Sequence, residues 1–125
     1  MKIQKINPEE ILYLKKEAIK DGILFPKKNP IYYGIKINDK VVAFGGIVLK
    51  KTRAIIKCDY VSNLYRNKGM ASSILSTRLL ILKELGVKYI EANCTKMALN
   101  IHLRKGARIS KEYKNGITKV FYENI

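Results

Sequence analysis

The sequence is poor in residues on which several classes of protein depend. It contains no tryptophan, one histidine and two cysteines in 125 residues. A structural zinc site needs several cysteine and histidine ligands close together, so we expect no metal site. Cys58 and Cys94 each lie in a strand-like segment, and we expect buried, reduced thiols rather than a disulfide scaffold.

Long hydrophobic runs are also missing. The longest are short pieces such as residues 79–82, whereas a helix that spans a bilayer needs about 18 or more apolar residues. The first 30 residues carry acids and lysines throughout and lack the apolar block of a signal peptide. We therefore expect a cytoplasmic protein that does not enter a membrane, folded as a single domain over residues 1–125.

Acidic residues are scarce, and the net charge is +15. Such an excess points to a polyanionic partner such as a nucleic acid. However, lysines number 20 against 5 arginines, and the charge is spread along the whole chain, as a bias in codon usage alone would produce. A nucleic-acid partner therefore remains one alternative.

Hydrophobic periodicity and turn signals predict an α/β fold. Asn7-Pro8 starts a helix that ends at Asp21-Gly22, with an apolar stripe formed by Ile11, Leu12, Leu14, Ala18 and Ile19. Further helices are expected over residues 70–85 and 96–105, and strands over residues 1–6, 32–37, 41–49, 53–62, 87–93, 107–113 and 117–123. Turns are expected at Asn38-Asp39 and Asn115-Gly116, and Gly45-Gly46 suggests a bulge or a close backbone contact. In the second helix, which Gly86 is expected to end, the residues with helical spacing are Met70, Ile74, Leu75, Leu79, Leu82 and Leu85. The order β-α-β-β-β-α-β-α-β-β predicts a mixed sheet with helices on both faces.

Residues 60–71 join a strand to a helix through a short polar turn. Such a turn directs unpaired N–H groups and the positive end of the helix dipole at one point, which favours an anion. Arg66 and Lys68 add charge there, and Gly69 allows a ligand to approach the backbone closely. The alternative is that Arg66 and Lys68 are solvated charges at the start of a helix.

The pattern Arg66-x-x-Gly69-x-Ala71, with Val61 five residues before the arginine, resembles the pyrophosphate-binding motif of the GNAT superfamily of acyl-CoA-dependent N-acetyltransferases. The predicted order of elements is also that of the GNAT fold, in which the sheet is partly splayed. The resemblance implies that acetyl-CoA (CoA) is the cofactor and that its pantetheine arm and phosphates bind mainly to backbone groups. The implied binding residues are Tyr60, Val61, Arg66, Asn67, Lys68, Gly69, Met70, Ala71 and Ser72.

Residues 98–107 resemble the second segment typical of the family. Ala98 and Gly106 match, but Thr95 replaces the usual Asn, and His102 stands where the family has a Tyr that protonates the departing thiolate. An imidazole can donate a proton at neutral pH, so His102 is our candidate general acid. The alternative is a half-buried histidine that fills the space of the tyrosine.

The attacking amine must lose a proton, and Asp59 and Glu91 are the candidate carboxylates for this role. A chain of waters could replace either one, and the N–H of Val61 could polarise the thioester carbonyl. Strand carboxylates are more often members of structural ion pairs, especially among so many lysines.

We therefore expect an N-acetyltransferase that acts by direct attack of a primary amine, with a small-molecule or macromolecular acceptor. The segment from Ile23 to Ile31 is too short for the second helix of the family, which suggests an open acceptor site suited to a large substrate. Tyr113 and Tyr122, with Lys111, Lys114 and Lys119, could stack on and bind a nucleic acid, or could simply form cross-strand pairs. The alternative functions are binding or modification of a polyanion and a non-catalytic CoA-binding module. The oligomeric state is not predicted.

Overall fold

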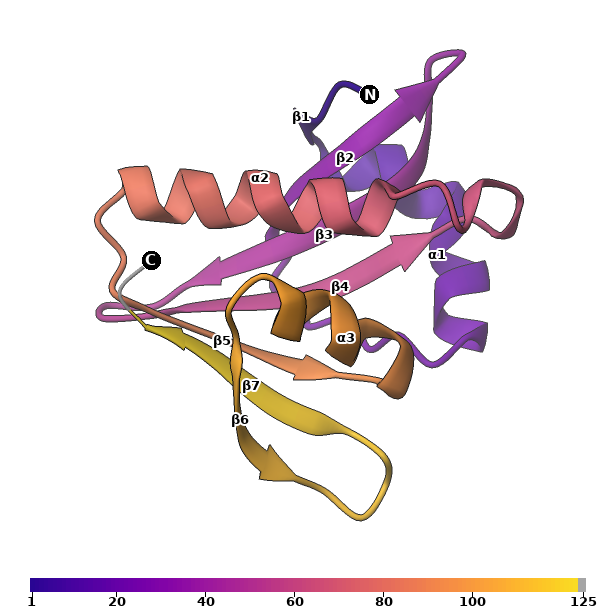
Figure 1. The fold of residues 1–125 in the computed structure, drawn as a ribbon. Helices are drawn as coiled ribbons and strands as arrows, with labels where there is room; N and C mark the ends of the chain where they lie inside the picture. Colours follow the sequence, from indigo (N-terminus) through magenta and orange to yellow (C-terminus); the bar gives the residue numbers. More distant parts are fainter. Residues whose placement is uncertain (124–125) are drawn as a thin grey trace. The chain divides into compact units, whose positions relative to one another are not determined.

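The structure is a computed structural model that describes residues 1–123. Its order of elements confirms the expected one (Figure 1). The strands are β1 (Gln4–Ile6), β2 (Ile31–Ile37), β3 (Lys40–Leu49), β4 (Ala54–Val61), β5 (Tyr89–Cys94), β6 (Arg108–Glu112) and β7 (Thr118–Glu123). The helices are α1 (Leu12–Lys20), α2 (Met70–Glu84) and α3 (Lys96–Arg104), with short 3₁₀ helices at Pro8–Ile11 and Asn63–Tyr65. Residues 21–30 contain no helix, as expected.

The strands form one mixed sheet in the order β1-β2-β3-β4-β5-β7-β6. Neighbouring strands whose register is defined are antiparallel, except for β4 and β5, which pair in parallel from Ala54↔Ile90 to Ile56↔Ala92. The chain divides into two compact units. Unit 1 comprises Met1–Ile47 and Cys58–Arg78, and unit 2 comprises Val48–Lys57 and the chain from Leu79 onward.

In unit 1, α1 covers one face of the sheet. The Glu10 carboxylate accepts a hydrogen bond from the Asn7 N–H at 3.1 Å, which completes the expected helix start. Ile11, Leu14 and Ala18 are buried against a core that includes Tyr32, Phe44, Cys58 and Tyr60. The prediction was wrong for Leu12 and Ile19, which are more than half exposed. The apolar stripe that packs against the sheet is therefore narrower than predicted and consists of Ile11, Leu14 and Ala18.

The other face of unit 1 packs against the first turns of α2 (Figure 1). Met70 and Ile74 are buried against Ile35, Val42 and Ala43. Helices therefore cover both faces, as predicted. The β2–β3 hairpin turns at Asn38-Asp39, as expected, and both residues have positive φ (52° and 65°).

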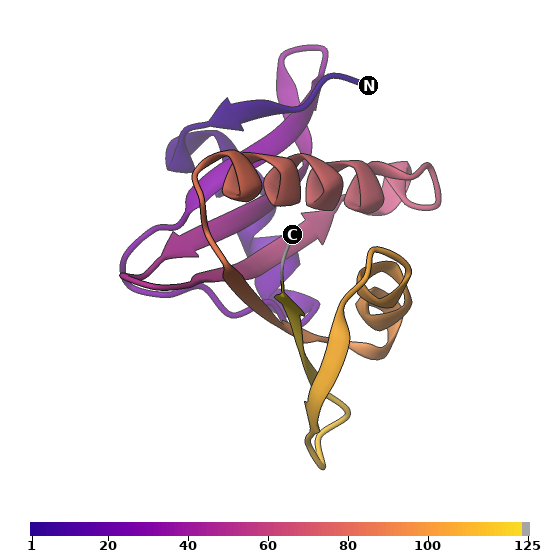
Figure 2. The ribbon, with the colours of Figure 1, turned by 60° about the vertical axis from the view of Figure 1, so that its left-hand side comes forward.

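In unit 2, α3 packs against β5 and β7. Figure 2 shows the β6–β7 hairpin with α3 beside it. The hairpin is closed by a hydrogen bond from the Tyr113 N–H to the Ile117 carbonyl at 2.8 Å, next to the expected Asn115-Gly116 turn. Cys94 of this unit, like Cys58 of unit 1, is buried, as expected. None of the helices within residues 1–123 has the length and apolar character needed to cross a membrane.

A buried arginine that the sequence analysis missed connects α2 to the sheet in unit 1. Arg78 is fully buried and donates two hydrogen bonds to the Asp59 carboxylate, at 2.8 and 2.6 Å. It also donates to the carbonyls of Gly46 (3.0 Å) and Ile74 (3.3 Å). A Cβ at Gly45 would lie 2.6 Å from the guanidinium carbon, which confirms the predicted close contact at Gly45-Gly46. The bulge in this hairpin lies elsewhere, between Ile35 and Lys36.

We predict that Arg78→Met lowers the free energy of unfolding by about 3 kcal/mol or more. The variant would leave the Asp59 carboxylate and the Gly46 carbonyl without their buried donor. Urea unfolding measures the loss, and Lys83→Met, at an exposed site on the same helix, is the matched control. Equal and small losses in both variants would contradict a stabilising role for the pair.

Candidate active site

The turn that connects β4 to α2 in unit 1 has the geometry of an anion site. After β4 ends at Val61, the Ser62 N–H donates to the Val42 carbonyl at 2.8 Å, which anchors the start of the turn. Asn67 and Gly69 then take positive φ values of 62° and 79°. Asn67, Lys68 and Gly69 are exposed, whereas Met70 is buried and anchors the other end.

The first N–H groups of α2 lie at this turn and have no acceptor within the helix, so they can donate to a ligand. Ser73 donates its N–H to the Gly69 carbonyl at 3.0 Å, so the amides of Met70, Ala71 and Ser72 precede this first helical bond. A Cβ built on Gly69 would meet nothing within 4 Å, so the space over the turn is open. The positive end of the helix dipole and the exposed Lys68 both favour an anion here. The turn therefore fits a phosphate group.

The Arg66 side chain is engaged within the protein instead of being free to bind an anion. Its Nη2 lies 2.9 Å from Asp21 Oδ2, and its Nε donates to the Val61 carbonyl at 2.9 Å. Its guanidinium also lies over the Tyr60 ring, 5.4 Å from the centroid. Tyr60 in turn donates its hydroxyl to Asp21 Oδ2 at 2.9 Å. Arg66 thus ties the turn to the end of α1.

Asp21 is the site residue that sequence reasoning missed, because Asp21-Gly22 as a local pattern indicates only the end of a helix. The hydrogen bond from the Arg66 guanidinium lowers the pKa of the Asp21 carboxyl, and the bond from the Tyr60 hydroxyl lowers it to a smaller extent. The same ion pair raises the pKa of Arg66. Burial raises the pKa of Tyr60, and the hydrogen bond to Asp21 raises it further. The hydroxyl is therefore protonated at neutral pH and can donate.

Both candidate carboxylates are members of ion pairs. In unit 1, Asp59 binds the buried Arg78 with both oxygens. In unit 2, Glu91 is buried and lies 2.9 Å from Arg53 and 3.0 Å from Lys119. Glu91 raises the pKa of Lys119, which keeps that lysine charged. These contacts favour the structural interpretation of both carboxylates, and their role as a general base stays a prediction.

His102 lies on α3 in unit 2 and is only 4% exposed. Its Nδ1 is 2.6 Å from the Tyr122 hydroxyl, which also lies 3.5 Å from the His102 carbonyl. The imidazole is therefore held by a tyrosine of β7. This arrangement orients the ring, and the role of His102 as a general acid stays a prediction.

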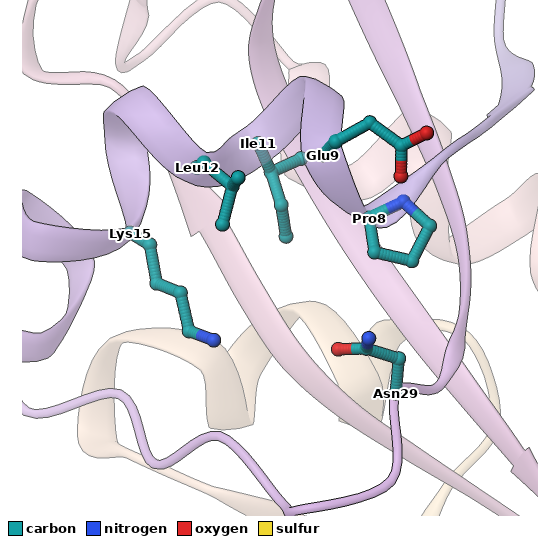
Figure 3. A pocket seen from close by; sticks show the side chains of 6 residues that line it. All are labelled: Pro8, Glu9, Ile11, Leu12, Lys15 and Asn29. Carbon is teal, nitrogen blue, oxygen red and sulfur yellow. The ribbon is translucent and has the colours of Figure 1, made fainter.

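A hollow of about 240 Å³ lies elsewhere in unit 1, beside the start of α1 (Figure 3). It is open and is lined by Pro8, Glu9, Ile11, Leu12, Lys15 and Asn29. None of these residues belongs to the turn or to the predicted site. Within residues 1–123, no three histidine, cysteine, aspartate or glutamate side chains come together in an arrangement that would hold a metal ion.

Comparison with known proteins agrees with this geometry. The model of the acetyltransferase (GNAT) family matches residues 4–105, which include the whole turn. The chain belongs to the GNAT acetyltransferase family. No curated protein matches it.

Solved structures share the GNAT fold at low sequence identity. A Mycobacterium tuberculosis protein crystallised in complex with CoA superposes with a TM-score of 0.81 at 12% identity, over 100% of both chains. A ribosomal-protein-alanine N-acetyltransferase from Brucella melitensis gives 0.80 at 10% identity, over 98% of this chain and 99% of that one. The ribosomal-protein-S18-alanine N-acetyltransferase from Escherichia coli gives 0.77 at 11% identity, over 98% and 92%.

We predict that the Asp21 ion pair stabilises this GNAT chain at neutral pH but not in acid. Because the folded pKa of Asp21 lies below its ordinary value of 3.8, the unfolded chain binds the proton more readily. The contribution is therefore complete above that value and is lost as the pH falls through the folded pKa. The melting temperatures of wild type and Asp21→Asn should differ near neutral pH and converge as the pH falls below 3.8 and through the lowered folded pKa.

Asp39→Asn is the control, because Asp39 is an exposed carboxylate in the β2–β3 turn. This variant removes one negative charge without altering the pair between Asp21 and Arg66. A constant gap between wild type and Asp21→Asn across the same range would contradict the predicted linkage.

Proposed function

We propose that the chain is an N-acetyltransferase that binds acetyl-CoA at the turn between β4 and α2 and acetylates a primary amine. The open, left-handed turn at Gly69, which leads into the first amides of α2, is the observation that carries the proposal. Family membership supplies the chemistry. The complex of the Mycobacterium tuberculosis protein with CoA also supports this cofactor, since that protein shares the fold.

The residues of the turn have distinct roles in this proposal. The N–H groups of Met70, Ala71 and Ser72 would bind the pyrophosphate, with Lys68 as the nearby exposed cation. Arg66 and Asn67 would shape the turn, Arg66 through its side chain and Asn67 through its left-handed backbone. Tyr60 and Val61 lie in the part of β4 that continues past Ile56↔Ala92, its last pair with β5, and would bind the pantetheine arm.

When bound, acetyl-CoA supplies an acetyl thioester that an amine attacks directly, forming the C–N bond and breaking the C–S bond. The N–H of Val61, at the end of β4, would polarise the acyl carbonyl by donating a hydrogen bond to its oxygen. A proton transferred to Asp59 or Glu91 would disturb an ion pair. We therefore favour water as the acceptor of the amine proton, with Asp59 and Glu91 as the alternatives.

The acceptor that we propose is an amine on a macromolecule. The family usually has a second helix in this part of the chain, which forms part of the wall of the acceptor pocket. Residues 21–30 contain no helix here, which favours an open acceptor site. Two neighbours in fold are named for the alanine of a ribosomal protein.

We predict that Gly69→Asp abolishes the shift in melting temperature that CoA produces, whereas Gly86→Asp retains it. The two glycines lie at opposite ends of α2, have φ near +80° and are open around the Cβ position. Both variants therefore suffer a similar backbone strain of about 1–2 kcal/mol. Only Gly69→Asp would place a carboxylate where the phosphates bind.

Thermal shift and calorimetry with CoA provide the measurement. Wild type that gives neither a shift nor heat would overturn the proposed function, as would a Gly69→Asp variant that binds CoA normally. Release of free thiol with a panel of amines then separates an enzyme from a non-catalytic CoA-binding module.

We predict that His102→Phe lowers turnover about tenfold or more, whereas His102→Tyr retains it. Phenylalanine keeps the approximate size of the side chain but cannot donate a proton, and tyrosine restores a donor of the kind usual in the family. Turnover at saturating acetyl-CoA is measured, with melting temperatures to detect loss of structure. Equal rates in both variants and wild type would eliminate His102 as the acid.

A further inference from the structure

The two faces of the β5–β7–β6 sheet in unit 2 differ in exposure. On the face toward α3, Ile90, Ala92, Val120 and Tyr122 are buried, and the contact between His102 and Tyr122 identifies this as the helical side. The residues that alternate with them point to the opposite face, because successive side chains in a strand alternate. These include Tyr89, Lys119 and Phe121, which are half-buried.

The strand register places basic side chains and aromatic rings together on this opposite face. Arg108 of β6 lies directly across from Phe121 of β7, and Lys111 lies across from Lys119. Residues directly across an antiparallel pair share a face. The rings of Tyr89 and Phe121 stack with centroids 5.9 Å apart and an interplanar angle of 17°. We call these five residues the aromatic-basic face.

The electrostatics of this face favour an anion. Lys111 and Lys119 form a like-charge pair across the strands, which is unfavourable when nothing neutralises it. The single negative charge of the buried Glu91 carboxylate is shared between Lys119 and Arg53, so it cannot fully neutralise these two cations. Unit 2 carries thirteen basic and four acidic residues, a net charge of +9. Glu123, which lies directly across from Tyr89 at the end of β7, adds one carboxylate to this face.

We propose that the aromatic-basic face binds single-stranded nucleic acid. Arg108 and Lys111 are exposed on an edge strand, where they can contact phosphates. The half-buried rings of Tyr89 and Phe121 offer an aromatic surface on which bases stack, and stacking of this kind tolerates any sequence. An acidic peptide would match the charge but would make no use of the rings. The residues of this surface belong to unit 2, whereas those of the proposed cofactor turn belong to unit 1.

The test is fluorescence anisotropy with a labelled single-stranded RNA of about 12 nucleotides. A plot of log affinity against log salt has a negative slope, and each phosphate contact to a single strand contributes about −0.7 to it. The double variant Arg108→Gln/Lys111→Gln should therefore make the slope less steep by about 1.4. The matched control, Lys27→Gln/Lys28→Gln, removes the same charge from exposed sites in unit 1 and should leave the slope nearly unchanged. An equal change in both variants would overturn the proposal, because it would mean that net charge alone attracts RNA.

Aromatic variants test the stacking. Phe121→Leu should weaken binding about fivefold or more, as expected when a stacked base is lost, without changing the salt slope. Tyr89→Leu is the second variant, should Phe121→Leu fail to fold. A polyglutamate peptide should compete poorly with RNA. Equal competition, unchanged affinity in the aromatic variant, or no RNA binding at about 50 mM salt would each overturn the proposal. The CoA-induced melting shift should persist in every variant, which separates this surface from the proposed transferase site.

Discussion

The interaction on which the candidate site depends is the one between Arg66 and Asp21. The guanidinium joins the turn to the end of α1, to the ring of Tyr60 and to the carbonyl of Val61. Because the charge is used in this way, the proposed attraction for a phosphate would come mainly from backbone amides and Lys68. Backbone amides fixed by folding need no reorganisation when an anion arrives, which is the advantage of a helix start as a phosphate site.

Features set by neighbouring residues were predictable from the sequence. The turns at Asn38-Asp39 and Asn115-Gly116, and the helix end at Gly86, follow from residues that tolerate positive φ. The match of residues 4–105 to the GNAT family confirms the resemblance that was based on Arg66, Gly69 and Ala71. Local chemistry of this kind needs no knowledge of distant partners, so the order and type of the elements could be predicted.

Pairings between distant residues could not be predicted. Asp21 and Arg66 are 45 residues apart, and Asp59 and Arg78 are 19 apart. With 25 basic residues and 10 acidic ones, each carboxylate has many candidate partners, and only the fold selects among them. The helical spacing of α2 indicated most of its buried face, although Leu85, which was expected there, is exposed. The spacing did not indicate that an arginine would be part of that face. The two glycines at 45 and 46 were the one local sign of the close approach.

The scarcity of acids also bears on the chemistry. Asp59 and Glu91, the two carboxylates proposed as bases, both have arginine partners, and Glu91 has a lysine as well. A carboxylate that neutralises buried or neighbouring cations is poorly suited to accept a proton, because protonation would leave those cations unpaired. In the proposed mechanism, catalysis would therefore depend on positioning the amine and polarising the acyl carbonyl, and backbone groups can perform both tasks. The excess of cations then remains for the surface, where it meets anions from solution.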